Sequence, residues 1–327
     1  MLNWYLQTGK NSDVVMHSKI SLARNLSQFN FYIKEEQEFL KLENLLQEKI
    51  IQIGYGLKLV KLRDLNEIEI QCLLEKGLIN QKMFQNPMLS SLLINDEENI
   101  SILINPENHV QVQVLGSGED IDAISNLCIE IDEKLQEVLD FSKCPQYGYL
   151  TVSPTDVGTG MKVSEILHLP ALTKTKIIQK LITFVRQCGI EILKVQSPDI
   201  YKITNERTLG ITEKDIVNNL KAMTEKIIEQ ERAARKLLAE NQIELEDTIL
   251  RSFGIFTNCK RISQKEAEEL LSNLKLGTDL GIVKELTDAK IRKLYLYIKP
   301  AILSKYFGQE FDENIKRAEV IKQITND

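Results

Sequence analysis

The sequence predicts an α+β fold, in which a mixed domain of strands and helices is followed by an all-helical domain. The range 110–114 alternates valine with glutamine, which is the period-two pattern of a half-buried strand. The ranges 35–53 and 120–139 carry apolar residues at helical spacing, so each predicts an amphipathic helix. After Gly210 the strand patterns stop and long helical patterns follow.

A polar loop separates two apolar runs in the first half, and it reads Asn105-Pro106-Glu107-Asn108-His109. Pro106 fixes its φ angle and lacks an amide hydrogen, which predicts a loop between two strands. Glu107 is the one carboxylate in this loop. It is therefore either a catalytic group or a solvated loop residue.

The next segment predicts, in order, a strand at 147–152, a turn at Gly158-Thr159-Gly160 and a helix that ends at Ile166. A turn with two glycines is more often structural than phosphate-binding. By itself it indicates no function.

The rest of the chain predicts helices. Thr212 and Asp215 form a capping pair at the start of one of them. Its apolar stripe contains Ile216, Leu220, Met223 and Ile227. The charged range 229–249 predicts more helix, and shorter helices follow Ser263. Their boundaries are predicted at Gly277, Gly281 and Pro300.

This change of pattern predicts two domains, at residues 1–235 and 236–327. With 327 residues, the chain is long enough for one large core and a smaller one. Its net charge of −6 argues against duplex nucleic acid as a partner, because affinity for duplexes depends on clustered lysine and arginine.

Cysteine usage and hydropathy predict a cytoplasmic protein. The five cysteines are widely spaced, without a Cys-x-x-Cys pair, which argues for a reducing compartment and against a disulfide framework or a zinc site. The three histidines are too far apart to form a local metal motif, so no metal site is predicted. The N-terminus lacks the apolar core of a signal peptide, and no apolar run approaches the roughly 20 residues of a membrane span.

Five stretches, in order, resemble motifs of one known family. Residues 18–25 (SKISLARN) resemble SRxRLARN, the loop at 105–109 resembles NEEDH, and residues 148–160 (GYLTVSPTDVGTG) resemble GYLTxCPTNxGTG. Residues 200–210 (IYKITNERTLG) resemble IYQISNxxTLG, and the C-terminal pieces EQER, RSFGI and LGTDLG complete the set. The chain is thereby similar to the bacterial protein-arginine kinases, relatives of the creatine and arginine (phosphagen) kinases.

This resemblance implies a phosphagen-kinase-like catalytic domain, with a large antiparallel sheet flanked by helices, and a C-terminal helical domain for self-association. It also implies transfer of the γ-phosphoryl group of MgATP to a guanidinium nitrogen. Such chemistry needs arginines that bind phosphate oxygens bidentately, and carboxylates that hold the guanidinium and take its proton.

The sequence departs from the family at those positions. Lys19 and Ser21 replace the two arginines of SRxR, and Gln111 and Lys162 replace two further phosphate-binding arginines. The predicted remnants of the nucleotide site are therefore Ser18, Lys19, Ser21, Gln111, Lys162 and Ser164.

The guanidinium site is reduced in the same way. Glu107 alone remains of the NEEDH carboxylates, where the main catalytic glutamate of the family lies, and Ser153 replaces a cysteine beside the guanidinium. The segment 193–199 is shortened and lacks the glycine-rich closure loop with its glutamate. Since one preorganised donor contributes on the order of 10²–10³ in rate and an arginine finger about 10³–10⁵, these losses predict a vestigial Glu107 and little remaining catalysis.

A C-terminal motif, RDxxRA, resembles a receptor for phosphoarginine in this family. Here it reads Glu313-Asn314-Ile315-Lys316-Arg317-Ala318. Glu313 puts a negative charge where a phosphoryl group would bind. Glu313, Asn314 and Arg317 are therefore predicted to be remnants of that receptor. The alternative is that they are now simply part of a solvated helix face.

Three hypotheses follow. The one we favour is a pseudokinase that works through binding, in a homo-oligomer or hetero-complex. The resemblance implies a small zinc-finger activator-like partner and a link to the Clp protease. The second is an active kinase with Lys19 and Lys162 on the phosphates and Glu107 as base. The third is a structural oligomer subunit. A cofactor, MgATP, is expected only if activity or residual binding is retained. Cationic side chains converging on the nucleotide cleft beside Glu107 would contradict the first hypothesis.

Overall fold

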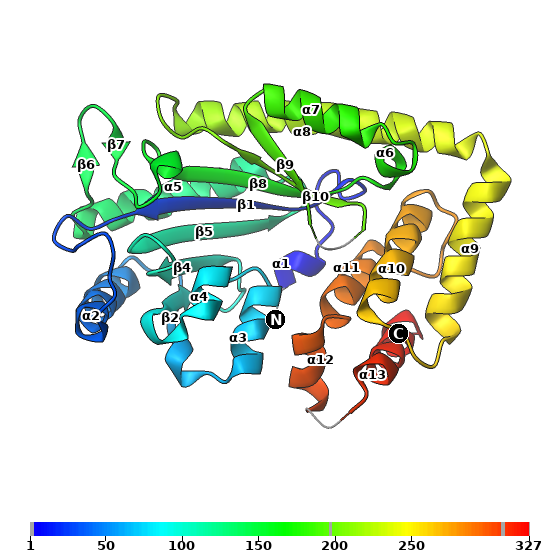
Figure 1. The fold of residues 1–327 in the computed structure, drawn as a ribbon, viewed down its shortest axis with the longest axis horizontal. Helices are drawn as coiled ribbons and strands as arrows, with labels where there is room; N and C mark the ends of the chain where they lie inside the picture. Colours follow the sequence, from blue (N-terminus) through cyan, green and yellow to red (C-terminus); the bar gives the residue numbers. More distant parts are fainter. Residues whose placement is uncertain (1–2, 196–197, 309–310, 327) are drawn as a thin grey trace.

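A computed structural model describes residues 3–195, 198–308 and 311–326, and its centre is an eight-stranded sheet (Figure 1). The strand order is β2-β3-β4-β5-β1-β8-β10-β9, and every neighbouring pair is antiparallel. The α+β class and the antiparallel sheet expected from the resemblance are thereby confirmed. The sheet consists of β1 (Val15–Arg24), β2 (Lys58–Lys61), β3 (Ser91–Ile94), β4 (Ile100–Ile104), β5 (Val110–Ser117), β8 (Met161–His168), β9 (Ile190–Lys194) and β10 (Ile200–Asn205).

Helices cover one face of the sheet, here called the back face. They are α5 (Ile121–Val138) and α8 (Glu213–Ala239), with α2 (Glu36–Gln52) beside α5. The alternating apolar residues of β1 and β5 and the apolar stripes of these helices form one core, because each element has a single apolar face to bury. Helices α6 (Pro170–Lys174) and α7 (Ile178–Gln187) complete this side.

The opposite face, here called the front face, is covered only in part. Short elements from the first hundred residues lie over β3, β4 and β5: α1 (Asn3–Leu6), the 3₁₀ helix η1 (Leu62–Asp64), α3 (Glu67–Glu75), α4 (Gln81–Gln85) and η2 (Pro87–Leu89). Between β5 and β10 the front face carries polar and cationic side chains. That region contains the candidate site.

The C-terminal helices form a second core that also contacts the sheet. They are α9 (Gln242–Asn258), α10 (Gln264–Asp279), α11 (Asp288–Tyr297), α12 (Pro300–Phe307) and α13 (Glu313–Asn326). Met16 and Ile200 belong to this second core, and Ile166 packs against it. Helix α10 and its neighbours therefore cover one end of the front face.

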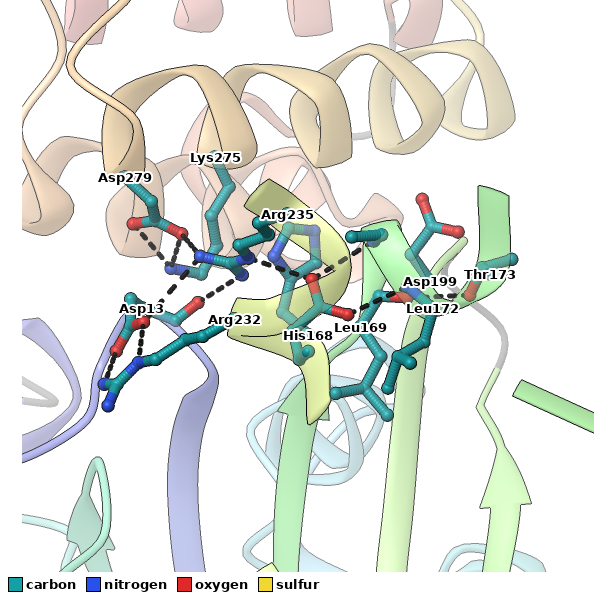
Figure 2. Close-up of polar contacts among 12 residues, drawn as sticks. Asp13, His168, Leu169, Leu172, Thr173, Asp199, Arg232, Arg235, Lys275 and Asp279 are labelled. Carbon is teal, nitrogen blue, oxygen red and sulfur yellow. Dashed lines mark hydrogen bonds and ion pairs between the residues drawn. The ribbon is translucent and has the colours of Figure 1, made fainter. Parts of the chain in front are cut away.

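A buried network of charged groups joins the two parts, as Figure 2 shows. Arg235, in the last turns of α8, donates to Glu231 at 2.8 Å and to Asp279 of α10 at 3.3 Å, and also to the carbonyl oxygen of Asp13 at 2.8 Å. Its side chain is 5% exposed. Lys275 of α10 donates to both carboxylate oxygens of Asp279. The loop before β1 and the helices α8 and α10 are therefore fixed to one another.

The same network reaches the end of β8. The carboxylate of Glu231 accepts the amide hydrogens of Ala171 and Leu172, at 3.1 and 3.0 Å, where α6 begins. His168, the last residue of β8, shares a hydrogen bond of 3.0 Å with Ser272 of α10.

Three predictions of local structure are wrong. The segment expected to be a helix ending at Ile166 is strand β8, because Met161, Val163 and Leu167 fill the back-face core between β1 and β10. Of the strand expected at 147–152, only Gly148–Tyr149 is extended; it is β7, which pairs with β6 (Lys143–Cys144).

The third wrong prediction is Gly277, which lies inside α10 rather than at a boundary. A Cβ atom there would collide with Ile249 of α9, so the glycine permits close helix packing. The charged helix predicted at 229–249 is interrupted at Glu240 and Asn241, between α8 and α9. The loop at 105–109 and the Thr212 cap, which accepts the amide hydrogen of Asp215, are confirmed.

Among the helices that the structure describes, none is both long enough and apolar enough to cross a bilayer.

Candidate functional site

The predicted residues of β1 do not all point to the same face of the sheet. Side chains alternate along a strand, so Lys19 and Ser21 point to the front face and Ser18 to the back face. Ser18 is fully buried, and its hydroxyl lies 2.7 Å from the carbonyl oxygen of Gly118 and 3.0 Å from Glu165. The structure therefore does not bring Ser18 to the other nucleotide-site residues.

Three lysines converge on the front face. Lys19 on β1 lies opposite Ser164 on β8, and Ser164 lies opposite Thr204 on β10. Lys162 lies in the front-face row on one side of Lys19, and Lys202 lies in the row on the other side, so the three lysines occupy three successive rows of the same face. The single arginine in the described strands, Arg24, lies on the back face and is bonded to Asp132 of α5 at 2.8 Å.

These lysines differ in their environment. Burial, together with repulsion from Lys202, lowers the pKa of Lys19 to about 7. Burial also lowers the pKa of Lys202, although Glu191 partly opposes the effect. Lys162 is held by Asp156 at 3.4 Å and donates to the carbonyl oxygen of Glu206 at 3.2 Å. Lys19 thus carries only part of a positive charge at neutral pH.

Glu107 lies apart from the lysine cluster, in the loop between β4 and β5. Lys82 of α4 donates to its carboxylate at 2.6 Å, and the glutamate side chain is 33% exposed. Gln111, the predicted remnant two residues after this loop, lies on the front face of β5 opposite Ala23. The cation nearest to Glu107 therefore comes from α4, not from the sheet.

Other parts of the loop are structural. The side-chain oxygen of Asn108 accepts hydrogen bonds from Asn25 at 3.1 Å and from the amide of Val152 at 2.8 Å. The ring of His109 accepts from the amide of Leu26 at 3.0 Å. These bonds fix the position of the loop, whatever Glu107 does.

The glycine turn at 158–160 is packed tightly against β1. A Cβ atom on Gly160 would lie 2.6 Å from the carbonyl oxygen of Ala23, and Gly160 has a φ of 64°. Arg24 donates to the carbonyl oxygen of Thr159 at 2.8 Å. Ser153, the predicted guanidinium-site remnant, bonds Thr155 at 2.7 Å. The turn at 158–160 is therefore held in place by contacts with Ala23 and Arg24 of β1.

The shortened segment 193–199 connects β9 to β10. Leu193 and Lys194 belong to β9, and Val195 donates its amide hydrogen to Ile200 at 3.0 Å, so the segment closes a hairpin. Gln196 and Ser197 lie outside the described residues.

A cavity of about 630 Å³ adjoins the lysine cluster. His17 and Ile166, which line it, are in the same row of the sheet as Lys202. Tyr295 of α11 lines it from the C-terminal side; its hydroxyl and Nδ1 of His17 are buried polar atoms without a partner in the described part of the chain. Burial lowers the pKa of His17 to about 3, so its ring is neutral at pH 7. The cavity thus combines aromatic walls and neutral polar groups with four charged residues, which are Glu75, Lys76, Glu268 and Lys299.

The C-terminal receptor remnants lie at the start of α13, on the far side of the second core. Arg317 is 1% exposed and donates to the carbonyl oxygens of Ile298 and Ile262, at 2.8 and 3.0 Å. It also bonds Asn314 at 2.9 Å and Glu313 at 3.4 Å. The expectation of a solvated helix face is therefore wrong for Arg317. Its guanidinium is buried and bonds the backbone at the end of α11 and before the start of α10.

Lys202, Lys82 and the cavity were missed by the sequence analysis. Lys202 could have been found from the alternation in β10, because it is on the same face as Thr204 once β10 is paired with β8. No sequence signal placed Lys82 next to Glu107, since the two residues are 25 positions apart in the sequence.

Comparison with known proteins defines the class. Residues 40–234 match the sequence profile of the ATP:guanido phosphotransferase C-terminal catalytic domain. In solved structures, the fold is similar to the duplicated taurocyamine kinase of Schistosoma mansoni, with a TM-score of 0.59 and 21% identity over 71% of this chain and 33% of that one. Lombricine kinase gives a TM-score of 0.59 with 18% identity over 69% of this chain and 68% of that one. The chain has the phosphagen kinase fold.

A match to the C-terminal helices, and relatives that align with nearly the whole chain, identify the family within this class. Residues 242–327 match the profile of the protein-arginine kinase McsB C-terminal domain. The protein-arginine kinase of Halothermothrix orenii is 38% identical over 99% of this chain and 96% of its own length. That of Bacillus subtilis is 35% identical over 98% of this chain and 92% of its own length. The chain belongs to the protein-arginine kinase family.

Proposed function

We propose that this protein is a catalytically silent member of the protein-arginine kinase family that has kept an anion-binding sheet face and acts through binding. The observation that carries the proposal is the composition of the front face. Between β5 and β10, the cations that the described strands present on this face are Lys19, Lys162 and Lys202, without an arginine.

Lysine supplies charge but not the geometry of arginine. A guanidinium holds two phosphate oxygens in a fixed plane, whereas an ammonium group is a strongly hydrated point charge on a flexible stem. In addition, Lys19 is only partly charged at pH 7 because its pKa is about 7. These groups can attract a polyphosphate, but they hold the transferred group less rigidly than phosphoryl transfer requires.

The ion pair of Glu107 supports the same conclusion. A catalytic base must reach the proton that it removes. One carboxylate oxygen of Glu107 accepts a bond from Lys82 at 2.6 Å, so a guanidinium substrate would first have to displace this lysine.

Residual nucleotide binding fits the site. The lysine cluster would hold phosphates, and the adjoining cavity of about 630 Å³ would take a planar base against its aromatic walls, with Glu75 and Glu268 among the polar groups that line it. Among the described residues, no three His, Cys, Asp or Glu side chains are grouped to hold a metal ion. Magnesium would therefore have to enter together with the phosphates that bind it.

The expected partner, by family resemblance, is a small zinc-finger activator-like protein, with a link to the Clp protease. The test combines two measurements on the full chain: thermal stability with and without MgATP, and phosphoarginine formation on the protein and on a protein substrate with that partner. Ligand at about 100 times its Kd raises stability by about 2.7 kcal/mol. We expect stabilisation without phosphoarginine, and phosphoarginine above background would overturn the proposal.

An active kinase with substituted ligands is the second candidate, and Lys202 is the observation that favours it. A third lysine, which the motif comparison did not count, brings more positive charge to the front face. The discriminating variants are Lys19→Gln, Lys162→Gln and Glu107→Gln. An enzyme would lose its biological role with each of them, whereas a silent binding protein with Glu107→Gln would keep it.

A further inference from the structure

Two lysines of the front face have no bonded partner in the described part of the chain. Neither a hydrogen bond nor an ion pair reaches the side-chain nitrogen of Lys19 on β1 or of Lys202 on β10. Lys162 differs, because it is paired with Asp156 and donates to the carbonyl oxygen of Glu206. Both unbonded lysines are half-buried on the sheet. An ammonium group in such a position is costly unless an anion joins it or its proton leaves.

The surroundings of Lys19 favour its neutral form. Its opposite neighbours on β5 and β8 are uncharged. Lys202, one row along, is the charged group that acts on it, and it repels a proton on Lys19. His17, in the row of Lys202, is neutral at pH 7. Glu191 of β9 and Lys162 act on Lys202, with opposite signs. No carboxylate therefore keeps Lys19 protonated, whereas Glu191 helps Lys202 to keep its proton.

This arrangement is that of a nucleophilic amine beside a phosphate ligand. Proteins prepare lysines for covalent chemistry by desolvation or by a neighbouring cation, and Lys19 has both. The rows of Lys19 and Lys202 are about 7 Å apart along the strands, a distance that two lysine stems can span together. A matching substrate has an electrophilic carbon directly next to a phosphate. Acyl phosphates, the mixed anhydrides of a carboxylic acid and phosphoric acid, have this structure, and in them the phosphate is also the leaving group.

We propose that Lys19 is a self-acylation site, at which the ε-amine takes an acyl group from a small acyl phosphate held by Lys202 and Lys162. The amine attacks the carbonyl carbon, and a C–N amide bond forms. The C–O bond to the phosphate breaks, and its electron pair leaves with inorganic phosphate, which also takes the surplus proton of the amine. The proposal rests on the anion-binding sheet face of the proposed function, but not on the loss of kinase activity.

Acylation changes what the front face can bind. An amide nitrogen takes up no proton near pH 7, so an acylated Lys19 no longer attracts phosphate. The added acyl group also lies one row from His17 and Ile166, which line the cavity. The modification thus lowers the affinity of this face for phosphates without changing the fold.

Peptide mass spectrometry of the full chain treated with acetyl phosphate at pH 7 tests the proposal. The internal reference is Lys34, which is exposed and has no partner among the described residues. We expect acetylation of Lys19 to be at least about ten-fold faster than that of Lys34, because about half of the Lys19 amine is neutral, against less than about one in a thousand for an ordinary lysine. The rate at Lys19 should level off above pH 7, while the rate at Lys34 continues to rise.

A second reagent separates reactivity from phosphate binding. Acetic anhydride carries no phosphate, so its preference for Lys19 over Lys34 should be smaller, and inorganic phosphate should suppress only the reaction with acetyl phosphate. Lys202→Gln should slow acetylation of Lys19 by acetyl phosphate about ten-fold or more, since it removes both the phosphate ligand and the repulsion. Lys194→Gln is the matched control: Lys194 is exposed on the back face of β9, and its substitution should leave the rate unchanged.

Three results would overturn the proposal: acetylation of Lys19 no faster than that of Lys34, an equal preference with the two reagents, or a reaction with acetyl phosphate that inorganic phosphate does not suppress. These comparisons use the unaltered chain, so they decide the question whether or not Lys202→Gln folds. Stabilisation by MgATP together with an unreactive Lys19 refutes this inference alone. Phosphoarginine formation refutes the silent-kinase proposal alone.

Discussion

Substitution of Arg235 by methionine should destabilise the whole protein strongly. The guanidinium is 5% exposed and donates to Glu231, to Asp279 and to the carbonyl oxygen of Asp13. Methionine keeps most of the aliphatic volume but removes the charge. The carboxylate of Glu231, itself fully buried, would then retain only its two bonds to backbone amides.

Removing one partner of a buried ion pair costs about 3–5 kcal/mol, because it leaves an uncompensated charge in the interior. A folded domain has about 5–15 kcal/mol of stability in total, so Arg235→Met should remove a large fraction of it. Burial already raises the pKa values of Glu231 and Asp279 against the effect of Arg235. Without the arginine, both carboxylates should take up protons more readily.

Urea unfolding followed by circular dichroism measures this change. The midpoint should fall while the slope m is unchanged. The control is Arg232→Met, three residues earlier in α8, because Arg232 is 45% exposed and its pair with Asp13 is worth about 1 kcal/mol or less. The double variant Glu231→Gln with Arg235→Met should recover part of the loss, since it removes both charges. If Arg235→Met costs no more than Arg232→Met, the network is screened by solvent and the argument fails.

Three further predictions concern titratable groups. Burial raises the pKa of Glu165 to about 7, so the folded chain keeps a proton that the unfolded chain loses near its usual value. Stability should therefore fall between about pH 4.5 and pH 7, by on the order of 3 kcal/mol, and Glu165→Gln should abolish this fall in denaturation curves. Affinity for ADP, measured by calorimetry, should rise below pH 7 as Lys19 gains its proton; the same pH dependence in Lys19→Gln would contradict this. Thiol labelling should modify the exposed Cys188 rapidly, whereas Cys128, buried and with a raised pKa, should react only on unfolding.

The sequence was sufficient to predict the fold class, the helices over 36–52 and 121–138 and the polar loop at 105–109. These elements have one apolar face each, with the period that their secondary structure requires. Strand β8 was misassigned because Glu165 interrupts its apolar alternation. That carboxylate is buried among Ser18 and Thr224, and a sequence pattern cannot show such tertiary hydrogen bonds.

The candidate site was predictable only as a set of substitutions. Motif comparison identified Lys19 and Lys162 as replacements for arginines, but the position of Lys202 depends on how β10 pairs with β8. The pair of Glu107 with Lys82 depends on where α4 lies over the sheet. Local patterns determine which residues point to one face. They do not determine which elements are brought together across that face.

Helix α8 has a consequence for the cooperativity of the molecule. Its 27 residues extend for about 40 Å, and its side chains belong to the first core from Ile216 to Ala234. Near its end, Leu238 packs against both cores. A single rigid element is thus common to the two halves, so neither can melt without exposing apolar surface of the other. Scanning calorimetry of the intact chain should accordingly record one heat-absorption peak instead of two.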